Sequence, residues 1–247
     1  MRVVGEPEES VLTIVLVHGS GHTSRVWEKV QSQLRHRSVA VDVPGRADRV
    51  APIAEVTLDD ATTSLAADVQ QATTGSLVLV GHSSGGIVLP RLAARLGDRV
   101  QHLVFVAGLC APHGELVMST VRPDAVHDLK QRLEVLRDEF AQSMLEPEPP
   151  VDGMHGIDTA TAAGIDSLNL MSQEVSWDGV AESLPRTFVR CTRDRIQTPA
   201  LQAALIENCA ASTVIDVESG HTPALSVPGE LAAILDDIAD RHAIIVR

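Results

Sequence analysis

Residues 78–88 read VLVGHSSGGIV, in which a run of apolar residues leads into the glycine-bracketed segment GHSSG at 81–85. The apolar run is typical of a strand buried on both faces of a parallel sheet, and a helical pattern follows the glycines. The segment matches G-x-S-x-G, where a tight strand-to-helix turn strains the central residue and needs small residues two positions away on each side. The stretch therefore predicts that Ser83 is a nucleophile above the end of a central strand. The alternative is a small-residue turn that only packs a helix on a strand.

Strand and helix patterns alternate on both sides of this stretch. Their order predicts an α/β fold with a mostly parallel sheet of about six strands and helices on both faces. Thr57, with Asp60 three residues later, predicts a capping box at the start of one helix, and Pro90 should kink or shorten another. The strands are expected at 12–17, 38–43, 76–81, 102–107, 187–192 and 212–217, and the helices at 24–34, 57–72, 85–96 and 228–238.

The middle of the chain breaks this alternation. Residues 112–185 contain no convincing strand, whereas 126–145 has a strong helical pattern and 157–184 is typical of two more short helices. We predict a helical cap or lid at 112–185 over the end of the sheet. It is inserted into an α/β core that is formed by residues 1–111 and 186–247.

The composition limits the classes of partner. The 247-residue chain has a formal net charge of −13, which argues against binding to nucleic acid or to an anionic membrane, because both need a basic face. Hydrophobic residues make up 44% of the chain, enough for a sizeable core, and the longest apolar runs are too short to span a bilayer. We expect no signal peptide, since the acidic N-terminus lacks the apolar stretch that one needs.

The three cysteines are Cys110, Cys191 and Cys209. Their number is odd and none of them has C-x-x-C spacing, which argues against a disulfide framework and against a zinc site. We expect three reduced, mostly buried thiols in a cytoplasmic protein, and no metal.

A serine hydroxyl becomes a good nucleophile only beside a base, and the base needs an orienting acid. Among the ten histidines, His221 is distinguished by its position, because it follows the predicted strand at 212–217 and precedes the last helix. A loop at the carboxyl end of a parallel strand lies at the same sheet edge as Ser83, which makes His221 the candidate base. The alternative is a loop histidine that caps the final helix.

The acid should leave the same sheet edge from a neighbouring strand. Asp194 lies just past the predicted strand at 187–192 and is the candidate. Arg193 and Arg195 flank it, so the alternative is a surface ion-pair partner. If Asp194 is not the acid, the substitutes are Glu218, close to the candidate base, and Asp216.

A small turn follows the first strong strand. Gly19 and Gly21 flank Ser20 there and let a backbone N–H approach the active serine. We expect the oxyanion hole to consist of the backbone N–H groups of Ser20 and Ser84, the second aided by a helix N-terminus, while the Ser84 hydroxyl needs no role. The alternative is an ordinary glycine-rich strand-to-helix turn. His22, in the same turn, is expected to be polar packing.

The sequence resembles the α/β-hydrolase superfamily over essentially the whole chain except the predicted cap. It is most similar to the branch that holds plant methylesterases and hydroxynitrile lyases, and to small bacterial serine esterases. The resemblance implies a serine-esterase mechanism without a metal or an organic cofactor, and the acid and base of that branch match Asp194 and His221. The segments that carry it are VLVHGSGH (15–22), VDVPGR (41–46), LVGHSSGG (79–86), CTRDRIQTP (191–199) and ESGHTPALSVP (218–228).

The sequence departs from this family in three places. The chain is short before residue 12, so the antiparallel hairpin that opens many relatives is expected to be missing. The predicted cap matches nothing that can be assigned. The plant lyases use a lysine near the catalytic histidine, and ESGHTPALS at 218–226 contains none, which argues against cyanohydrin cleavage.

These features lead to the hypothesis of a serine hydrolase that cleaves a carboxylic ester or lactone of a small to medium, moderately apolar molecule. Two other hypotheses stay open. One is a lyase or cyclase that acts on a natural-product-like substrate with the same site, and the other is a non-catalytic ligand receptor, since a fold hosts many functions. The expected partner is the small-molecule substrate, with no nucleic acid and no membrane, and a homodimer is left open.

Overall fold

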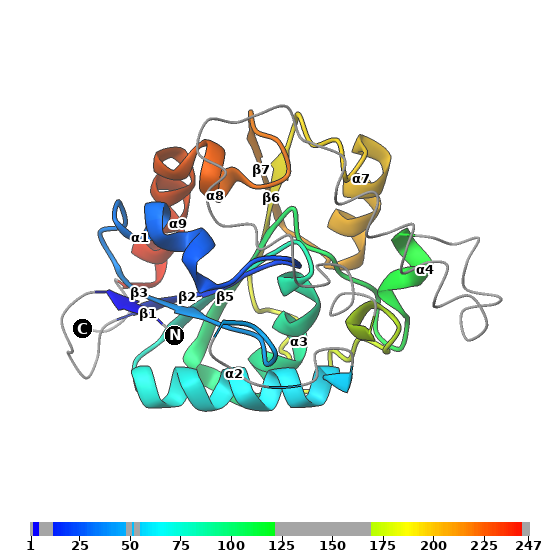
Figure 1. Ribbon diagram of the computed structural model, residues 1–247, viewed down its shortest axis with the longest axis horizontal. Coiled ribbons are helices and arrows are strands. Elements are labelled where there is room, and N and C mark those ends of the chain that lie inside the picture. Colours follow the sequence, from blue (N-terminus) through cyan, green and yellow to red (C-terminus); the bar gives the residue numbers. More distant parts are fainter. Residues whose placement is uncertain (1, 5–11, 48–50, 52–54, 122–168, 244–247) are drawn as a thin grey trace.

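The computed structural model describes residues 2–4, 12–47, 51, 55–121 and 169–243 (Figure 1). The described residues form a seven-stranded sheet with the strand order β1-β3-β2-β4-β5-β6-β7. The strands β2 to β7 are parallel, and β1 pairs antiparallel with β3 at one edge. Their bounds are β1 Arg2–Val4, β2 Thr13–Val17, β3 Arg37–Val41, β4 Leu77–His82, β5 Val100–Val106, β6 Arg186–Cys191 and β7 Thr213–Val217.

Both faces of the sheet are buried, which explains the nearly continuous apolar runs. Successive side chains of a strand point to opposite faces. In β2, Val15 and Val17 therefore belong to one core cluster, and Ile14 and Leu16 belong to another on the opposite face. All four side chains have no exposed surface. Because both faces are covered, apolar residues occupy the consecutive positions 14–17 of β2. The strand therefore lacks the alternation of polar and apolar residues that a half-buried strand shows.

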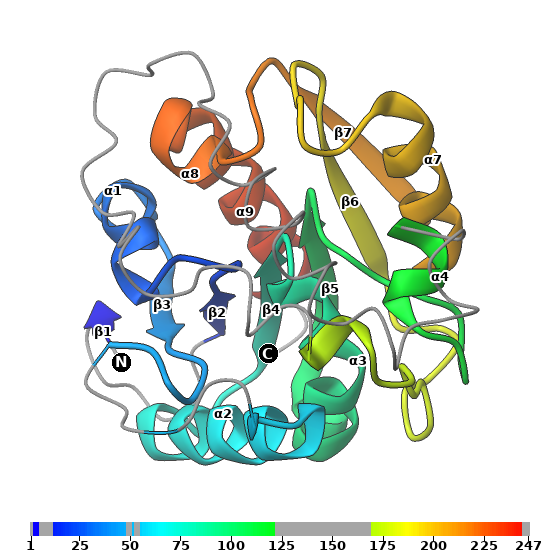
Figure 2. The ribbon, with the colours of Figure 1, turned by 45° about the vertical axis from the view of Figure 1, so that its right-hand side comes forward.

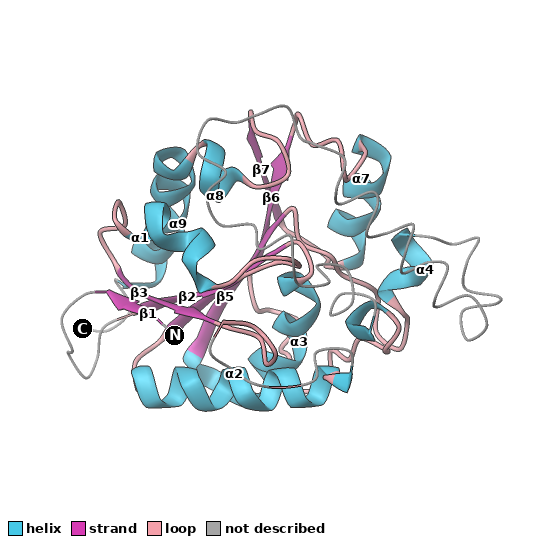
Figure 3. Cartoon of the chain, in the orientation of Figure 1, coloured by secondary structure: helices cyan, strands magenta, loops and turns pink. Residues whose placement is uncertain are grey.

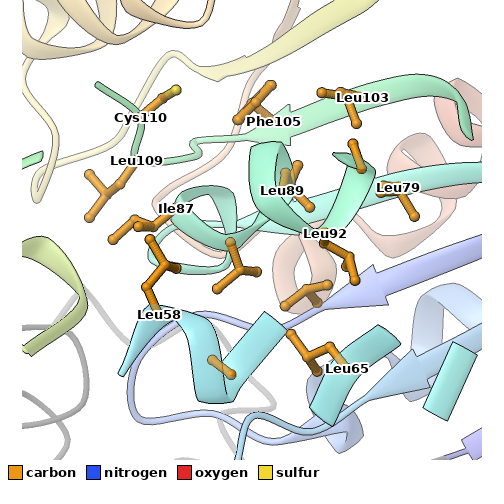
Figure 4. Packing of buried hydrophobic residues seen from close by; sticks show 14 of the residues in the cluster. Leu58, Leu65, Leu79, Ile87, Leu89, Leu92, Leu103, Phe105, Leu109 and Cys110 are labelled. Carbon is orange, nitrogen blue, oxygen red and sulfur yellow. The ribbon is translucent and has the colours of Figure 1, made fainter. Parts of the chain in front are cut away.

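Helices cover both faces of the sheet (Figures 2 and 3). The helices α2 and α3 pack on one face, where Figure 4 shows leucines of α2 close to Ile87, Leu89 and Leu92 of α3. The other face is covered by α1, α8 and α9, whose apolar side chains join the second cluster. The helices are α1 Glu28–Gln31, α2 Leu58–Ala72, α3 Gly85–Leu96, α4 Val117–Val121, α7 Pro199–Asn208, α8 Pro223–Ser226 and α9 Pro228–Ala243, and the 3-10 turns are Ser24–Trp27 and Gly97–Arg99.

The predicted fold class is confirmed, and each predicted strand lies within two residues of an observed one. The capping box is also present. The Asp60 backbone N–H donates to Thr57 Oγ1 over 3.1 Å, and the Thr57 backbone N–H donates to Asp60 Oδ2 over 3.1 Å. These bonds satisfy two backbone donors at the start of α2 that have no partner within the helix.

Two expectations about local structure can be compared with the described residues. They contain no opening hairpin, since the single short strand β1 pairs antiparallel with β3 rather than with β2, in a register that places Arg2 opposite Ala40. Such a short edge strand depends on long-range pairing, which a local pattern does not reveal. Pro90 does not shorten α3, which runs from Gly85 to Leu96. Proline removes only one helical hydrogen bond, and the burial of α3 against the core outweighs that loss.

The predicted cap lies largely outside the described residues, and this includes the helix expected at 126–145. The two short helices expected at 157–184 also fall partly outside the described residues, and the described part, 169–184, is helical at 169–171. Residues near Trp177 form turns instead. The Ser176 hydroxyl bonds to the Asp178 carboxylate over 3.0 Å, and Gly179 has a φ of +77°, which ends helical geometry.

Candidate active site

Ser83 lies on a sharp turn between β4 and α3. Its φ of +49° falls in the left-handed region, which residues other than glycine seldom adopt. The turn is closely packed, because a Cβ on Gly81 would lie 2.6 Å from the carbonyl oxygen of Gly85, and one on Gly85 would lie 2.6 Å from that of His18. Only glycine fits at both positions, which is the physical content of the G-x-S-x-G spacing. The strained turn directs the serine side chain away from the sheet.

The structure brings Ser83, His221 and Asp194 together at the carboxyl ends of β4, β6 and β7. His221 Nδ1 lies 2.7 Å from Asp194 Oδ2, and His221 Nε2 lies 2.9 Å from Ser83 Oγ. A carboxylate only accepts hydrogen bonds, so Nδ1 carries the proton and Nε2 accepts from the serine hydroxyl. All three residues are buried. The three side chains thus form one hydrogen-bonded chain in the geometry expected of a nucleophile, a base and an orienting acid.

The Asp194 carboxylate is held by its own loop. Its Oδ1 accepts hydrogen bonds from the backbone N–H groups of Ile196 and Gln197 over 2.8 Å and 2.9 Å, which leaves Oδ2 directed at His221. The alternative of a surface ion pair does not fit, because the neighbouring Arg193 bonds to Glu218.

The two substitute acids are engaged elsewhere. Glu218 forms the exposed pair with Arg193, and Asp216 accepts two hydrogen bonds of 2.7 Å from Arg190. Both carboxylates are at least half exposed, whereas the side chain of Asp194 is fully buried. Geometry therefore favours Asp194 over both of them as the partner of His221.

The turn at 19–22 approaches the serine closely. A Cβ on Gly19 would lie 2.9 Å from the Ser83 Cβ, and Gly21 has a φ of +72°. The Ser20 and Ser84 hydroxyls bond to each other over 3.0 Å, which brings the two predicted oxyanion residues side by side. Their backbone N–H groups make no hydrogen bond to any other described residue. The sequence assigned no role to the Ser84 hydroxyl, and its contact with Ser20 is a feature that sequence reasoning missed.

Three further histidines surround the site. His18 Nδ1–H donates to the Gly19 carbonyl over 2.8 Å, and His18 Nε2 accepts from the Val43 N–H over 3.2 Å, so this side chain braces the turn. His82 Nε2 lies 2.8 Å from the carbonyl oxygen of His221. The sequence signal for His82 is its place inside G-x-S-x-G, but a motif does not indicate what the side chain of its variable position touches.

The His22 and His82 imidazoles are neutral near neutral pH. Burial, with a smaller contribution from His18, lowers the pKa of His22 from 6.5 to about 3. Burial, with smaller contributions from His221 and His22, also lowers the pKa of His82 well below its usual value. Neither ring therefore adds a positive charge beside His221 in this range.

Among the described residues, no group of three or more His, Cys, Asp or Glu side chains is arranged to hold a metal ion, and no helix is long and apolar enough to cross a membrane. The thiols of Cys110, Cys191 and Cys209 are free and buried. Burial raises the pKa of Cys209 to about 12 and that of Cys110 well above its usual value, so both thiols stay protonated at neutral pH.

The sequence model of the Alpha/beta hydrolase family matches residues 14–234. The chain belongs to this family. Methylesterase 3 of Arabidopsis thaliana is 25% identical over 273 residues, which cover 96% of this chain and 99% of the relative. Lipase LipV of Mycobacterium tuberculosis is 26% identical over 249 residues, which cover 90% and 91% of the two chains. The crystal structure of the pyrethroid hydrolase PytH superposes with a TM-score of 0.71 at 22% identity and covers 94% of this chain and 99% of that one.

This alpha/beta hydrolase thus has relatives with esterase names, including methylesterases, as the resemblance of its motifs predicted. The likeness to PytH shows the shared fold. The matched residues 14–234 include the turn at 19–22, Ser83, Asp194 and His221, so the family covers every part of the candidate site.

Proposed function

We propose that this protein is a serine hydrolase that cleaves a carboxylic ester or lactone through an acyl-enzyme on Ser83. The observation that carries the proposal is the continuous hydrogen-bond chain from Ser83 Oγ through His221 to the Asp194 carboxylate. This chain lies at the carboxyl ends of parallel strands, where α/β folds bind their ligands. The esterase and lipase names of the relatives support the same reaction class.

In the acylation step, Ser83 Oγ attacks the carbonyl carbon of the substrate while its proton passes to His221 Nε2. Asp194 stays ionised, accepts the hydrogen bond from Nδ1–H and stabilises the imidazolium that forms. The tetrahedral intermediate then collapses, and His221 donates the proton to the departing alkoxide. The products of this step are an alcohol and the Ser83 ester; in a lactone the two remain one molecule.

The negative charge of the tetrahedral intermediate needs donors that are already in place. The backbone N–H groups of Ser20 and Ser84 are available for it, since no other described residue accepts from them. Ser84 is the N-cap of α3, where the helix dipole adds partial positive charge. In the second step, His221 takes a proton from water, the hydroxide attacks the acyl carbon, and the proton returns to Ser83 as the acid leaves.

The substrate is expected to be small to medium and moderately apolar. The predicted cap at 112–185 contains leucine, valine and methionine with few aromatic residues, and the whole chain contains no tyrosine. Aliphatic side chains bind alkyl and small ring groups by burial without a strong requirement for polar groups on the substrate.

The proposal is tested by the hydrolysis of p-nitrophenyl esters from acetate to decanoate by the wild type and by Ser83→Ala. We expect turnover by the wild type and a loss of roughly 10⁴-fold or more in the variant, because the acyl-enzyme route is closed. The chain length of the best substrate then measures the size of the acyl site. Equal turnover by the two proteins would contradict the assignment of Ser83.

A second candidate function is a non-hydrolytic conversion by the same acid–base pair. The observation that favours it is the relative named Norfluorocurarine synthase 2 from Strychnos, which is 26% identical over 267 residues and covers 92% of this chain. Product analysis separates the two functions. A hydrolase releases an acid and an alcohol with one oxygen from labelled water in the acid, whereas a lyase or cyclase incorporates no labelled oxygen.

A further inference from the structure

His82 occupies the variable position directly before the nucleophile and is almost completely buried. Its ring lies among the three loops that form the site. His82 itself ends β4, its Nε2 contacts the loop that carries His221, and its Nδ1 faces the turn that carries Ser20. The residue directly before Ser83 therefore contacts both the loop that carries His221 (the base loop) and the turn at 19–22 (the oxyanion turn).

The contact with the base loop is a directed hydrogen bond. His82 Nε2 lies 2.8 Å from the backbone carbonyl oxygen of His221, and a carbonyl only accepts, so Nε2 carries the proton. The His221 ring is in turn held at its own Nδ1 by Asp194 over 2.7 Å. His221 is thus fixed at two points, its ring by the acid and its backbone by the residue next to the nucleophile. Two fixed points determine the orientation of the ring as well as its distance from Ser83.

The opposite edge of the His82 ring is closely packed but makes no hydrogen bond. His82 Nδ1 has no hydrogen-bond partner within the described part of the chain. A Cβ on Gly19 would lie 3.0 Å from this nitrogen, so the backbone of the oxyanion turn contacts the ring edge. The Trp27 ring meets His82 edge-on with centroids 6.4 Å apart, and the His221 ring lies 5.1 Å away.

We propose that His82 is a positioning residue, which sets the place of the His221 imidazole relative to Ser83 through its hydrogen bond to the His221 backbone. The inference rests on the proposed function, in which His221 is the base. It assigns to His82 no contact with the substrate and no proton in the reaction. Its neutral state agrees with this role, because a protonated ring would add a second buried charge beside the imidazolium of His221.

The test compares His82→Gln with His82→Met. The two side chains are similar in length and volume, but only the glutamine amide can donate to the His221 carbonyl from about the position of Nε2. The readout is the rate constant for phosphonylation of Ser83 by a fluorophosphonate, followed by intact mass. We expect His82→Gln to stay within about threefold of the wild type and His82→Met to lose roughly 10- to 100-fold, as a displaced base does.

The matched control is the same pair of substitutions at His102, a buried histidine on β5 that lies away from Ser83. His102→Gln and His102→Met should differ in melting temperature and react with the probe as fast as the wild type. If His82→Met is phosphonylated as fast as His82→Gln, the positioning role is overturned. Equal losses in both His82 variants, with wild-type melting temperatures, would also overturn it, because the donor would then be irrelevant.

A second readout does not depend on any reaction. Nitrogen-15 labelled histidine reports which ring nitrogen carries the proton, and His221→Gln assigns the signal of His221. The proposal expects the Nδ1–H form of His221 in the wild type and in both His82 variants, because Asp194 is retained, and a shifted His221 Nε2 signal in His82→Met alone, because the displaced ring changes its contact with Ser83. An unchanged His221 spectrum in His82→Met would contradict it. If the wild type is not phosphonylated at Ser83, the proposed function fails, and these spectra alone decide whether His82 positions His221.

Discussion

Buried histidines lie at both ends of the parallel strands, and their hydrogen bonding differs between the two ends. At the amino end, His102 of β5 bonds to His242 over 2.9 Å and to Thr187 over 2.8 Å, so both of its ring nitrogens have partners. At the carboxyl end, His82 of β4 has one partner for two nitrogens within the described residues, and the next residue, Ser83, has a strained backbone. Paired polar groups stabilise a fold, whereas backbone strain collects where the fold serves a reaction.

The same contrast appears in pairs of hydroxyl groups and in glycines. The Thr13 and Thr73 hydroxyls bond over 3.2 Å at the amino end, and the Ser20 and Ser84 hydroxyls bond over 3.0 Å at the carboxyl end. A Cβ on Gly97, before β5, would meet nothing within 4 Å, whereas one on Gly19 would lie 2.9 Å from the Ser83 Cβ. Equivalent substitutions at the two ends therefore separate effects on stability from effects on activity.

After the loss of the nucleophile itself, the largest effect is expected from Asp194→Asn. The amide can donate to His221 and so favours the wrong tautomer, which leaves Nε2 unable to take the serine proton; we expect kcat to fall roughly 10³- to 10⁴-fold. The measurement is steady-state hydrolysis of the best p-nitrophenyl ester. His102→Gln, at the other end, should retain wild-type kcat. Retained activity in Asp194→Asn would remove Asp194 from the site.

Gly19→Ala should follow, with a fall of roughly 100-fold in kcat, because the added methyl group displaces the oxyanion turn from the nucleophile. The control is Gly97→Ala, which has open space but a φ of +60° and should lower the free energy of unfolding by about 1–3 kcal/mol at unchanged kcat. Ester turnover and urea unfolding of both variants provide the comparison. Equal kcat values for Gly19→Ala and Gly97→Ala would show that a methyl group at Gly19 disturbs the site no more than one at Gly97.

His102→Gln should change the pH dependence of stability. Burial, with smaller contributions from His242 and Arg241, lowers the pKa of His102 from 6.5 to about 4. Between these values the unfolded state binds the proton and the folded state does not, so stability is complete above pH 6.5 and is lost as the pH falls toward about 4.

Across that window the wild type should lose about 1–3 kcal/mol more of its free energy of unfolding than His102→Gln. Urea denaturation at several pH values measures this difference. Parallel curves for the two proteins would mean that the folded and unfolded states bind the His102 proton equally well, contrary to its buried and doubly bonded position.

The smallest effect is expected from Ser84→Ala. The variant keeps the backbone N–H but loses the bond to the Ser20 hydroxyl, a contribution of about 0.5–1.5 kcal/mol that corresponds to roughly a two- to tenfold fall in kcat. Thr13→Val removes the corresponding bond at the amino end and should lower stability without changing kcat. A Ser84→Ala enzyme with wild-type kcat would restrict the hydroxyl pair to a structural role.

The sequence predicted the parallel core because its strands are buried on both faces and leave long apolar runs, such as LTIVLV at 12–17. It also predicted which side chains meet, because Ser83, Asp194 and His221 each follow a strand and the carboxyl ends of parallel strands share one edge. The hydrogen bonds of the Ser84 hydroxyl and of His82 could not be predicted, since they join loops far apart in the chain. The three-residue strand β1 was not predicted for the same reason, since it pairs with the distant strand β3.

The most direct test of the central claim is the identification of the acylated residue. Turnover of a p-nitrophenyl ester by the wild type is quenched with acid, and the digested protein is examined by mass spectrometry. Activated esters acylate serine hydrolases readily, so the acyl-enzyme accumulates. The account predicts the acyl mass on the peptide at Ser83 and its absence from Ser83→Ala. An acyl group on another residue, or release of p-nitrophenol by Ser83→Ala at the wild-type rate, would contradict it.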